Sequence, residues 1–565
     1  MRRVTGTVEV TRNFTDSFFM YIDSIPNGSR FDYIVVGAGS AGCVLANRLS
    51  ANGKHQVLVI EAGDRDSRFS FRLPLMVANV LNDDDVTWPY VTVPQGGLNG
   101  QSVPWRRGRV LGGCSSINGA VFTRGDPVEY DQWAAMGCSG WSYDDLLPYF
   151  KKLEDADGDR NVRGRGGPIH CTRLSRHPDV LSRAFVDAAK EAGFPESEDY
   201  NDGAHYEGAF HLQYSTRNGW RDSASVAYLN PAAKRENLTV LLNAKVTSVL
   251  MDGVTAQGVE ILLGARRLCI KANKEVILAA GPLETPKLLE LSGIGNPDVL
   301  AQFGIAPILA LPGVGENLRD HPNTRVTFKC SKAVTINDLV ASPLRKVQAG
   351  LEFLFRRTGM LSICSVTAGM NIKSAPNLAR LDLVMRLQLL SGINRYSRQK
   401  SKGLDAHSGF SISTMAMYPK SVGSVHLQST DPTVQAKMDP RYLSQEEDVL
   451  TLVKGLRLAR KLTEMPSLAP WVIEETRPGA ACSSDYEMME YARNTAGTSW
   501  HMSGTCKMGA DAQSVVDLEC RVIGASRLRV VDSSIFPSLP SPNTNIPTFA
   551  IAEKAADLIL ADRDT

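Results

Sequence analysis

The sequence lacks several features that would by themselves assign it to a class. No stretch of about 18 apolar residues occurs, and no signal-peptide-like apolar run follows Arg2 and Arg3, so we expect a cytoplasmic protein without a transmembrane segment. Neither charge sign dominates, because 62 basic side chains face 60 acidic ones. This balance gives no indication of nucleic acid or an anionic membrane as a partner, and it favours a small-molecule ligand.

Metal-binding and disulfide patterns are missing too. The ten cysteines are scattered and none forms a C-x-x-C pair, which removes the usual signals for a zinc site or a disulfide scaffold. In the stretch from 156 to about 228, His170, His177, His205 and His211 show no ligand spacing with acids or cysteines, and we expect no metal. The length of 565 residues suffices for two large lobes. The oligomeric state stays open, and a homo-oligomer is compatible with the sequence.

The most informative stretch lies near the N-terminus. A short apolar run at residues 33–36 is typical of a buried parallel strand, and it ends in Gly37, Gly39 and Gly42, a G-x-G-x-x-G pattern that opens an amphipathic helix. A second apolar strand follows at residues 57–60. The glycines permit a tight turn, close approach of a pyrophosphate and close packing of helix on strand. The stretch therefore predicts a dinucleotide-binding βαβ unit.

An acidic residue completes this unit. Glu61 ends the second strand, nineteen residues after Gly42. A carboxylate at that place accepts hydrogen bonds from an adenosine ribose and repels a 2′-phosphate. The unit thus favours FAD or NAD over NADP, without separating the first two.

Four further stretches carry a family resemblance. They are GRVLGGCSSINGAVFTRGDPVEYDQW at 108–133, GPLETPKLLELSGIG at 281–295, SWHMSGTCKMG at 499–509 and RVVDSSIFPSLPSPNTNIPTFAIAEKAADLIL at 529–560. With the first βαβ unit they resemble, in order, the glucose-methanol-choline (GMC) flavin oxidoreductases. Within the family, the chain resembles bacterial alcohol and choline dehydrogenase-like or aryl-alcohol oxidase-like members.

The resemblance implies a GMC fold, in which an α/β flavin-binding domain of Rossmann type joins a second α+β substrate domain built on an antiparallel sheet. Alternating strand patterns at 381–390, 410–419 and 424–429 favour that sheet. We expect residues 1–30 to form a flexible leader. The FAD-binding domain is expected at 31–155, 229–321 and 495–565, and the substrate-binding domain at 156–228 and 322–494.

The resemblance also implies a set of FAD-binding residues. They are Gly37, Gly39, Ser40, Ala41, Gly42, Glu61, Ala62, Trp88, Arg109, Gly112, Gly113, Ser115, Asn118, Val246, Asp532, Ser533, Thr544 and Asn545. Some family members attach FAD through a histidine, but the corresponding position here is Ile117, which has no nucleophilic atom. We therefore expect non-covalent FAD. Asn545 suits the cap and Pro547 the first turn of a final helix, and the resemblance implies that the N-terminus of this helix faces the flavin.

Two residues are expected to carry the chemistry. Oxidation of an alcohol moves a hydride to the flavin and a proton to a base with a pKa near neutrality, and His501 lies in the family motif for that base. Asn543 can donate its amide N–H to the alcohol oxygen. Trp500, Met385 and Met415 are candidates for the substrate pocket, although apolar strand residues more often belong to a core.

The expected function is FAD-dependent oxidation of a primary alcohol to an aldehyde, with a possible second step to the acid. Molecular oxygen, a quinone or a dye could accept the electrons, and oxidase and dehydrogenase remain open. The alternatives are a lyase of the same fold, resembling hydroxynitrile lyases, a non-catalytic flavoprotein and an NAD-linked enzyme. No carboxylate cage for a quaternary ammonium is evident, which disfavours choline relative to other alcohols.

Overall fold

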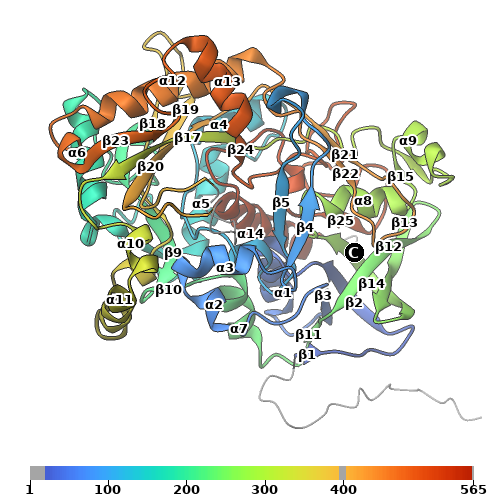
Figure 1. The fold of residues 1–565 in the computed structure, drawn as a ribbon. Coiled ribbons are helices and arrows are strands. Elements are labelled where there is room, and N and C mark those ends of the chain that lie inside the picture. The colour runs from blue at the N-terminus through green and yellow to red at the C-terminus, as the bar shows by residue number, and fades with distance from the viewer. Residues whose placement is uncertain (1–19, 394–402, 563–565) are drawn as a thin grey trace, which may run out of the picture.

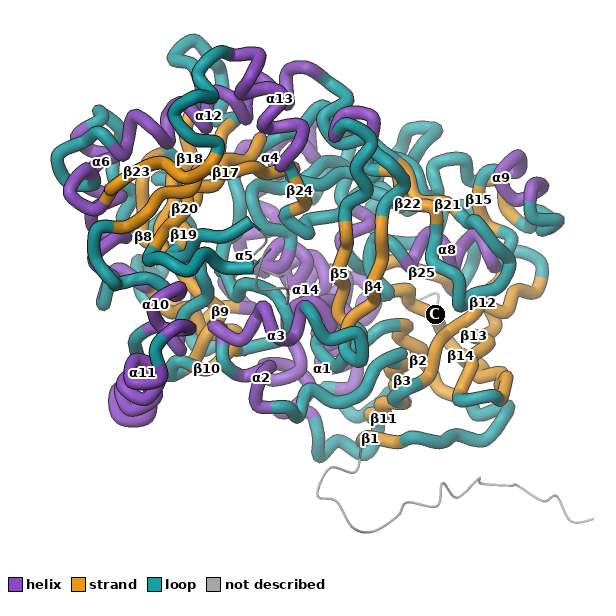
Figure 2. Tube along the Cα trace, viewed as in Figure 1, coloured by secondary structure: helices purple, strands orange, loops and turns teal. Residues whose placement is uncertain are grey.

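A sheet of eight strands forms the base of the first lobe in the computed structural model, which describes residues 20–393 and 403–562 (Figures 1 and 2). Its centre is parallel, and an antiparallel meander of three long strands extends one side. In spatial order the strands are β1 (Tyr21–Ile22), β11 (Leu238–Leu241), β3 (Val57–Ile60), β2 (Arg30–Val36), β14 (Arg266–Leu278), β13 (Thr255–Leu263) and β12 (Ala244–Asp252), with β25 (Leu528–Val530) also paired to β14.

The predicted βαβ unit is present. Strand β2 leads through the glycine loop into α1 (Ser40–Ser50), which returns to β3. The last four residues of β2 and all four of β3 are buried, and α1 packs on both strands. Sequence periodicity thus located the unit to within a few residues at each end.

Helix α14 (Asn545–Ala561) packs against α1 and completes the first lobe. It lies at the centre of the molecule and also packs on α5 (Tyr143–Leu153) (Figure 1). Arg48 of α1 forms a bidentate ion pair with the fully buried Glu553 of α14, at 2.7 and 2.8 Å. Tyr228 donates its hydroxyl to the same carboxylate at 2.9 Å. The buried charge of Glu553 is therefore paired and hydrogen-bonded. These contacts link α1, near the start of the sequence, to α14, near its end.

An antiparallel sheet of seven strands forms the second lobe, at the upper left of Figure 1. One face packs on α6 (Val180–Glu191) and α12 (Glu446–Thr463) in an apolar core. The other face looks toward the first lobe. In spatial order the strands are β23 (Val472–Arg477), β17 (Pro322–Cys330), β20 (Gly409–Ala416), β19 (Leu383–Gln388), β18 (Val366–Ile372) and β8 (Gly208–His211), with β24 (Gly497–Thr498) paired to β17.

Smaller sheets and helices surround the two lobes. The remaining strands are β10 (Trp220–Arg221), β9 (Gln213–Arg217), β7 (Ile169–Arg173) and β6 (Glu154–Ala156) in one sheet, and the pairs β4 (Thr87–Val91) with β5 (Pro104–Gly108), β15 (Ile294–Gly295) with β16 (Leu309–Ala310), and β21 (Ser424–His426) with β22 (Lys437–Asp439). The remaining helices are α2 (Phe69–Arg72), α3 (Val77–Leu81), α4 (Pro127–Ala135), α7 (Asn230–Ala232), α8 (Glu284–Leu291), α9 (Pro297–Gln302), α10 (Ile336–Ala341), α11 (Pro343–Arg356) and α13 (Asp485–Thr495). Within 20–393 and 403–562, no helix is both long and apolar enough to cross a membrane.

Three expectations need correction. Residues 20–30 are not a flexible leader, because Tyr21–Ile22 pairs with β11 as an edge strand; residues 1–19 lie outside the described ranges. The pattern at 424–429 yields the short strand β21, which pairs with β22 and not with the large sheet. Asn545 is the first residue of α14 and not its capping residue, a position that Thr544 occupies.

Candidate active site

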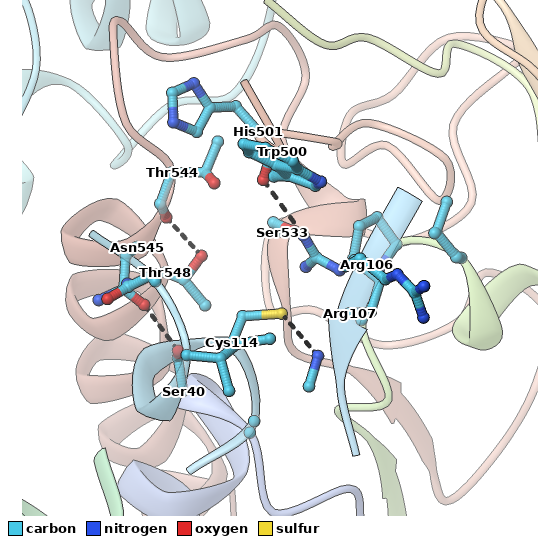
Figure 3. A pocket seen from close by; sticks show the side chains of 18 of the residues that line it. Ser40, Arg106, Arg107, Cys114, Trp500, His501, Ser533, Thr544, Asn545 and Thr548 are labelled. Atoms are coloured by element: carbon cyan, nitrogen blue, oxygen red, sulfur yellow. Dashed lines mark hydrogen bonds between the residues drawn. The ribbon is translucent and has the colours of Figure 1, made fainter. Parts of the chain in front are cut away.

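A cavity of about 330 Å³ lies between the two lobes. It starts at the carboxyl ends of the parallel strands β2, β3 and β14 and ends at the inner face of the antiparallel sheet. Figure 3 shows Ser40 and Asn545 on one side of this space and Trp500 with His501 on another. Crevices outside the carboxyl ends of such strands are where α/β proteins bind nucleotides.

The glycine loop has the shape that a pyrophosphate requires. Gly37 adopts a left-handed φ of +99°, and a side chain on Gly42 would come within 1.9 Å of the Gly37 carbonyl oxygen. A Cβ on Gly39 would meet nothing within 4 Å, so this backbone faces open cavity. Gly113 packs against it, since a Cβ there would come within 2.7 Å of the Gly39 Cα. These close approaches leave a cradle of main-chain groups at the start of α1, which fits a dinucleotide phosphate.

Glu61 lies where a ribose is expected. Its carboxylate accepts the Ala38 N–H at 2.9 Å and the Gly63 N–H at 2.9 Å, and it lines the cavity. Burial raises the pKa of Glu61 to about 7, against the opposing effect of those two hydrogen bonds. The hydrogen bonds from Ala38 and Gly63 fix the position of the carboxylate. Its oxygens can still accept further hydrogen bonds from hydroxyl groups.

The C-terminal segment supplies the opposite wall. Asp532 accepts hydrogen bonds from the Gly281 N–H at 2.9 Å and the Thr285 hydroxyl at 2.7 Å, so its carboxylate joins two loops beside the cavity. Asn545 accepts the Ser40 hydroxyl at 2.7 Å, which links the start of α14 to the start of α1 (Figure 3). Both helix N-termini therefore open onto the same space, where free N–H groups favour negative charge.

Most of the predicted cofactor residues line this cavity. They are Gly37, Gly39, Ser40, Ala41, Glu61, Ala62, Trp88, Gly113, Asn118, Val246, Asp532, Ser533, Thr544 and Asn545. Ile117 also lines it, where the resemblance places an attachment point in other members. The glycine cradle, the acid and the two helix ends make the described residues a fit for FAD.

Four predicted cofactor residues, Gly42, Arg109, Gly112 and Ser115, are not part of the cavity wall, and their contact with FAD stays a prediction. Gly42 keeps α1 against β2. Gly112 has a φ of +80°, and Ser115 donates its hydroxyl to the Gly112 carbonyl at 2.6 Å, which shapes the loop before Gly113. The Arg109 guanidinium lies 5.2 Å from the centre of the Trp88 ring and orients that ring.

His501 and Asn543 meet at the catalytic end. The Asn543 amide nitrogen lies 2.8 Å from His501 Nε2, and His501 Nδ1 lies 3.1 Å from His321 Nδ1. His321 Nε2 lies 2.9 Å from the Met417 carbonyl oxygen, which can only accept. Asp320 holds the main chain here, because its carboxylate accepts the His501 N–H at 2.7 Å.

These contacts assign the protons on both rings. Because a carbonyl faces His321 Nε2, that nitrogen carries the hydrogen, and His321 Nδ1 is left as an acceptor. His501 Nδ1 must then donate to it, so His501 Nε2 holds a lone pair that faces the Asn543 amide. His501 therefore presents the unprotonated nitrogen of a neutral ring to the cavity.

The pKa values agree with neutral rings. Burial lowers the pKa of His321 to about 4. Burial, followed by repulsion from His321, Arg107 and Arg386, lowers the pKa of His501 well below its ordinary value. The sequence-based expectation was a pKa near neutrality, and the difference comes from enclosure between the lobes, which a motif does not reveal.

Of the predicted pocket residues, two line the cavity and one does not. Trp500 lies beside His501 with a left-handed φ of 60°, and its carbonyl accepts a hydrogen bond from Arg107 at 3.1 Å (Figure 3). Met415 also lines the cavity. Met385 instead points into the apolar core behind the sheet, which corrects the expectation; strand alternation directs its neighbour Arg386 to the cavity.

The sequence reasoning missed several residues at the catalytic end. They are Arg107, Asn323, Cys364, Arg386, Gln388, Ser413 and Ser499. A signal was available for Arg386 and Gln388, because two polar residues with period two interrupt an otherwise apolar strand. His321 was visible only as part of a loop sequence. Within the described ranges, no group of three or more acidic, histidine or cysteine side chains could hold a metal ion.

Comparisons with known proteins decide the family. The sequence profiles of the GMC oxidoreductases match residues 31–323 for the N-terminal part and residues 419–552 for the C-terminal part. The chain belongs to the GMC oxidoreductase family. The predicted FAD cofactor and the assignment to FAD-dependent alcohol oxidoreductases are thereby confirmed.

Curated relatives match almost the full length. The chain is 39% identical to the "Oxygen-dependent choline dehydrogenase" of Photobacterium profundum, over 94% of this chain and 93% of the relative. It is also 39% identical to the human "Choline dehydrogenase, mitochondrial", over 94% of this chain and 89% of the relative. These proteins are similar to this chain, and their names describe their own activities.

Solved structures confirm the predicted GMC fold. Pyridoxine 4-oxidase from Mesorbium loti superimposes with a TM-score of 0.84 at 28% identity, over 93% of this chain and 98% of the other. An FAD-dependent oxidoreductase from Chaetomium thermophilum gives a TM-score of 0.85 at 27% identity, over 94% and 99%. The second lobe with its antiparallel sheet is therefore part of the shared architecture.

Proposed function

We propose that the protein oxidises a primary alcohol to an aldehyde, with His501 as the general base and Asn543 as the group that orients the alcohol oxygen. The observation that carries this proposal is the convergence of one acceptor and one donor. His501 Nε2 and the Asn543 amide nitrogen are 2.8 Å apart and both line the cavity. A hydroxyl group at this point can give its proton to the imidazole and accept a hydrogen bond from the amide.

The protonation state of His501 supports its role as a base. A base must be unprotonated before the reaction, and the lowered pKa of His501 keeps the ring neutral at physiological pH. The hydrogen bond from Nδ1 to His321 fixes which nitrogen is free. Bound FAD supplies the hydride acceptor at its N5 atom.

Without an alcohol in the site, the single lone pair of His501 Nε2 accepts one Asn543 N–H. A bound alcohol replaces that hydrogen bond: its hydroxyl donates to His501 Nε2, and the Asn543 amide donates to the alcohol oxygen while negative charge develops there during transfer of the proton. Such a donor is most effective where water is excluded, and His501 is partly buried in the wall of the cavity between the lobes. The rings of His321 and His501 meet edge to face, with centroids 5.1 Å apart, which leaves little freedom for either to rotate.

The first electron acceptor that we propose is molecular oxygen, with a quinone as the other candidate. The name of the bacterial relative includes oxygen dependence, and two similar structures are oxidases by name. Non-covalent attachment of FAD is part of the proposal, because Ile117 offers no nucleophile.

One experiment tests the proposal. The yellow holoenzyme is mixed anaerobically with a panel of alcohols, and loss of the flavin absorbance is followed by rapid mixing. We expect bleaching by a primary alcohol, and a reduction rate about 10²- to 10⁴-fold slower in His501→Ala at the same FAD content. Admission of air then times reoxidation. A fold-competent enzyme that no alcohol bleaches would favour a lyase, and an unchanged rate in His501→Ala would place the base elsewhere.

A further inference from the structure

We infer that Arg386 is a substrate-binding residue and that the natural substrate is an alcohol that also carries an anionic group, such as a carboxylate. This inference deepens the proposed function and rests on it. The inference concerns the part of the substrate that lies away from the reacting hydroxyl group.

The guanidinium of Arg386 is built into the inner face of the antiparallel sheet. Arg386 is only 7% exposed and lines the cavity from β19. Its Nη1 donates to the Met385 carbonyl at 2.9 Å and to the Asn371 side-chain oxygen at 3.2 Å. The opposite residue on β18 is Gly369, and a Cβ there would come within 2.6 Å of Arg386 Nη1. The missing side chain at Gly369 gives the guanidinium its space.

Arg386 lacks an acidic partner among the described residues. It takes part in no ion pair there, and its Nε and Nη2 make no hydrogen bond with residues 20–393 or 403–562. Burial without a counter-ion lowers the pKa of the guanidinium to about 10, which still leaves it charged at neutral pH. A buried cation with unused donors is costly unless something binds it, and a carboxylate matches its planar donor pair.

The acids that line the cavity cannot serve as that counter-ion. They are Glu61, Glu284 and Asp532. Glu61 and Asp532 bond the loops of the nucleotide end, and Glu284 accepts the Tyr90 hydroxyl at 2.6 Å and lies 3.5 Å from Lys287. By contrast, the cavity residues contributed by the antiparallel sheet carry no carboxylate: Asn323, Val366, Arg386, Gln388, Ser413 and Met415.

The charge of Arg386 reaches the catalytic base. Its field contributes to the lowered pKa values of both His501 and His321, so the guanidinium lies near the point where the alcohol reacts. A second cation, Arg107, acts on His501 from β5. A quaternary ammonium alcohol such as choline would meet two like charges here, whereas an anionic alcohol would be attracted to them. The choline-oxidising relatives therefore share the fold but need not share the substrate.

The test uses three alcohols of similar length on the holoenzyme: 4-hydroxybutanoate as the anion, 3,3-dimethyl-1-butanol as the neutral probe and choline as the cation. Anaerobic flavin bleaching gives an apparent Kd and a limiting rate for each. Butyrate and butyramide, which carry no hydroxyl, are titrated separately by the change in flavin absorbance. We expect the anionic member of each set to bind about 10- to 100-fold more tightly in the wild type.

Three variants separate the charge of Arg386 from a general effect on folding. Arg386→Gln should abolish the preference for the anion, and Arg386→Lys should keep part of it. Arg325→Gln is the matched control, because Arg325 lies on β17 of the same sheet, separated from β19 by β20 and outside the cavity wall, and donates to the carbonyls of Gly392 and Ile393. This control should leave the preference unchanged.

The outcomes are distinct. If choline or the neutral alcohol binds as tightly as the anion, or if Arg386→Gln retains the preference, the inference is wrong while the proposed function stands. If no alcohol bleaches the flavin, the proposed function is wrong, and the butyrate titration still decides whether Arg386 binds anions. Should Arg386→Gln fail to fold, the wild-type comparison of butyrate with butyramide remains decisive.

Discussion

The two ends of the cavity recognise their ligands by different means. The nucleotide end consists mainly of main-chain groups, exposed where Gly37, Gly39 and Gly113 lack side chains. The catalytic end consists of side chains delivered by strands and loops far apart in the chain, as with His321 and His501. Substitutions that add atoms should therefore impair the nucleotide end, and substitutions that remove side-chain atoms should impair the catalytic end.

The largest effect should follow from adding one methyl group at the nucleotide end. In Gly42→Ala the new Cβ would lie 1.9 Å from the Gly37 carbonyl oxygen, so α1 must move away from β2. We expect the FAD content to fall from about one per chain to near zero, with destabilisation of about 1–3 kcal/mol or more. FAD absorbance per chain and the Tm of the apoprotein measure both effects.

Gly39→Ala is the control that sharpens this comparison. Its Cβ would meet no atom within 4 Å and would point into the space expected for the pyrophosphate. The Tm of the apoprotein should stay close to wild type while FAD affinity falls. Equal loss of Tm in Gly39→Ala and Gly42→Ala would show that the two glycines do not have separate roles.

A smaller effect is expected from an atom removed at the catalytic end. His321→Leu eliminates the acceptor for His501 Nδ1, so His501 loses the hydrogen bond that fixes its tautomer and ring orientation. The rate of anaerobic flavin reduction should fall about 10- to 100-fold at unchanged FAD content. His321→Asn can place a carbonyl oxygen near the former Nδ1 position and should lose less. Similar rates for both variants would argue against tautomer control.

The smallest effect concerns pH and Glu61. Burial raises the pKa of Glu61 from 4.5 to about 7 in the folded apoprotein, so the folded chain holds a proton that the unfolded chain releases between these values. The contribution of Glu61 to the free energy of unfolding therefore decreases as pH rises from about 4.5 to 7. The difference in Tm between wild-type and Glu61→Gln apoprotein should follow this trend. Parallel pH profiles would contradict it.

The same contrast explains what the sequence could predict. The glycine loop and Glu61 follow each other within one βαβ unit, so local spacing and the chemistry of phosphate binding suffice to locate them. His501 and Asn543 were recognisable only through a resemblance to family motifs, because nothing local marks a catalytic histidine. Their 2.8 Å contact confirms that the two residues lie together, while their roles remain predictions.

The sequence did not predict which strand side chains face the cavity. Met385 was expected at the pocket, yet its side chain lies in the core while Arg386 faces the cavity, a difference of one residue along β19. Which face of a strand is functional depends on the elements packed against it, and α12 covers the Met385 face. The tautomer of His501 depends likewise on His321, which is 180 residues away in sequence.

The pairing of α1 with α14 has a consequence for biosynthesis. Arg48 and Glu553 are separated by 505 positions, so α1 leaves the ribosome long before the helix that covers it. Throughout most of translation the nascent chain exposes an apolar flank beside an incomplete phosphate cradle. Cofactor capture must then wait for the last segment to dock, and flavin colour should report selectively on chains that have reached α14.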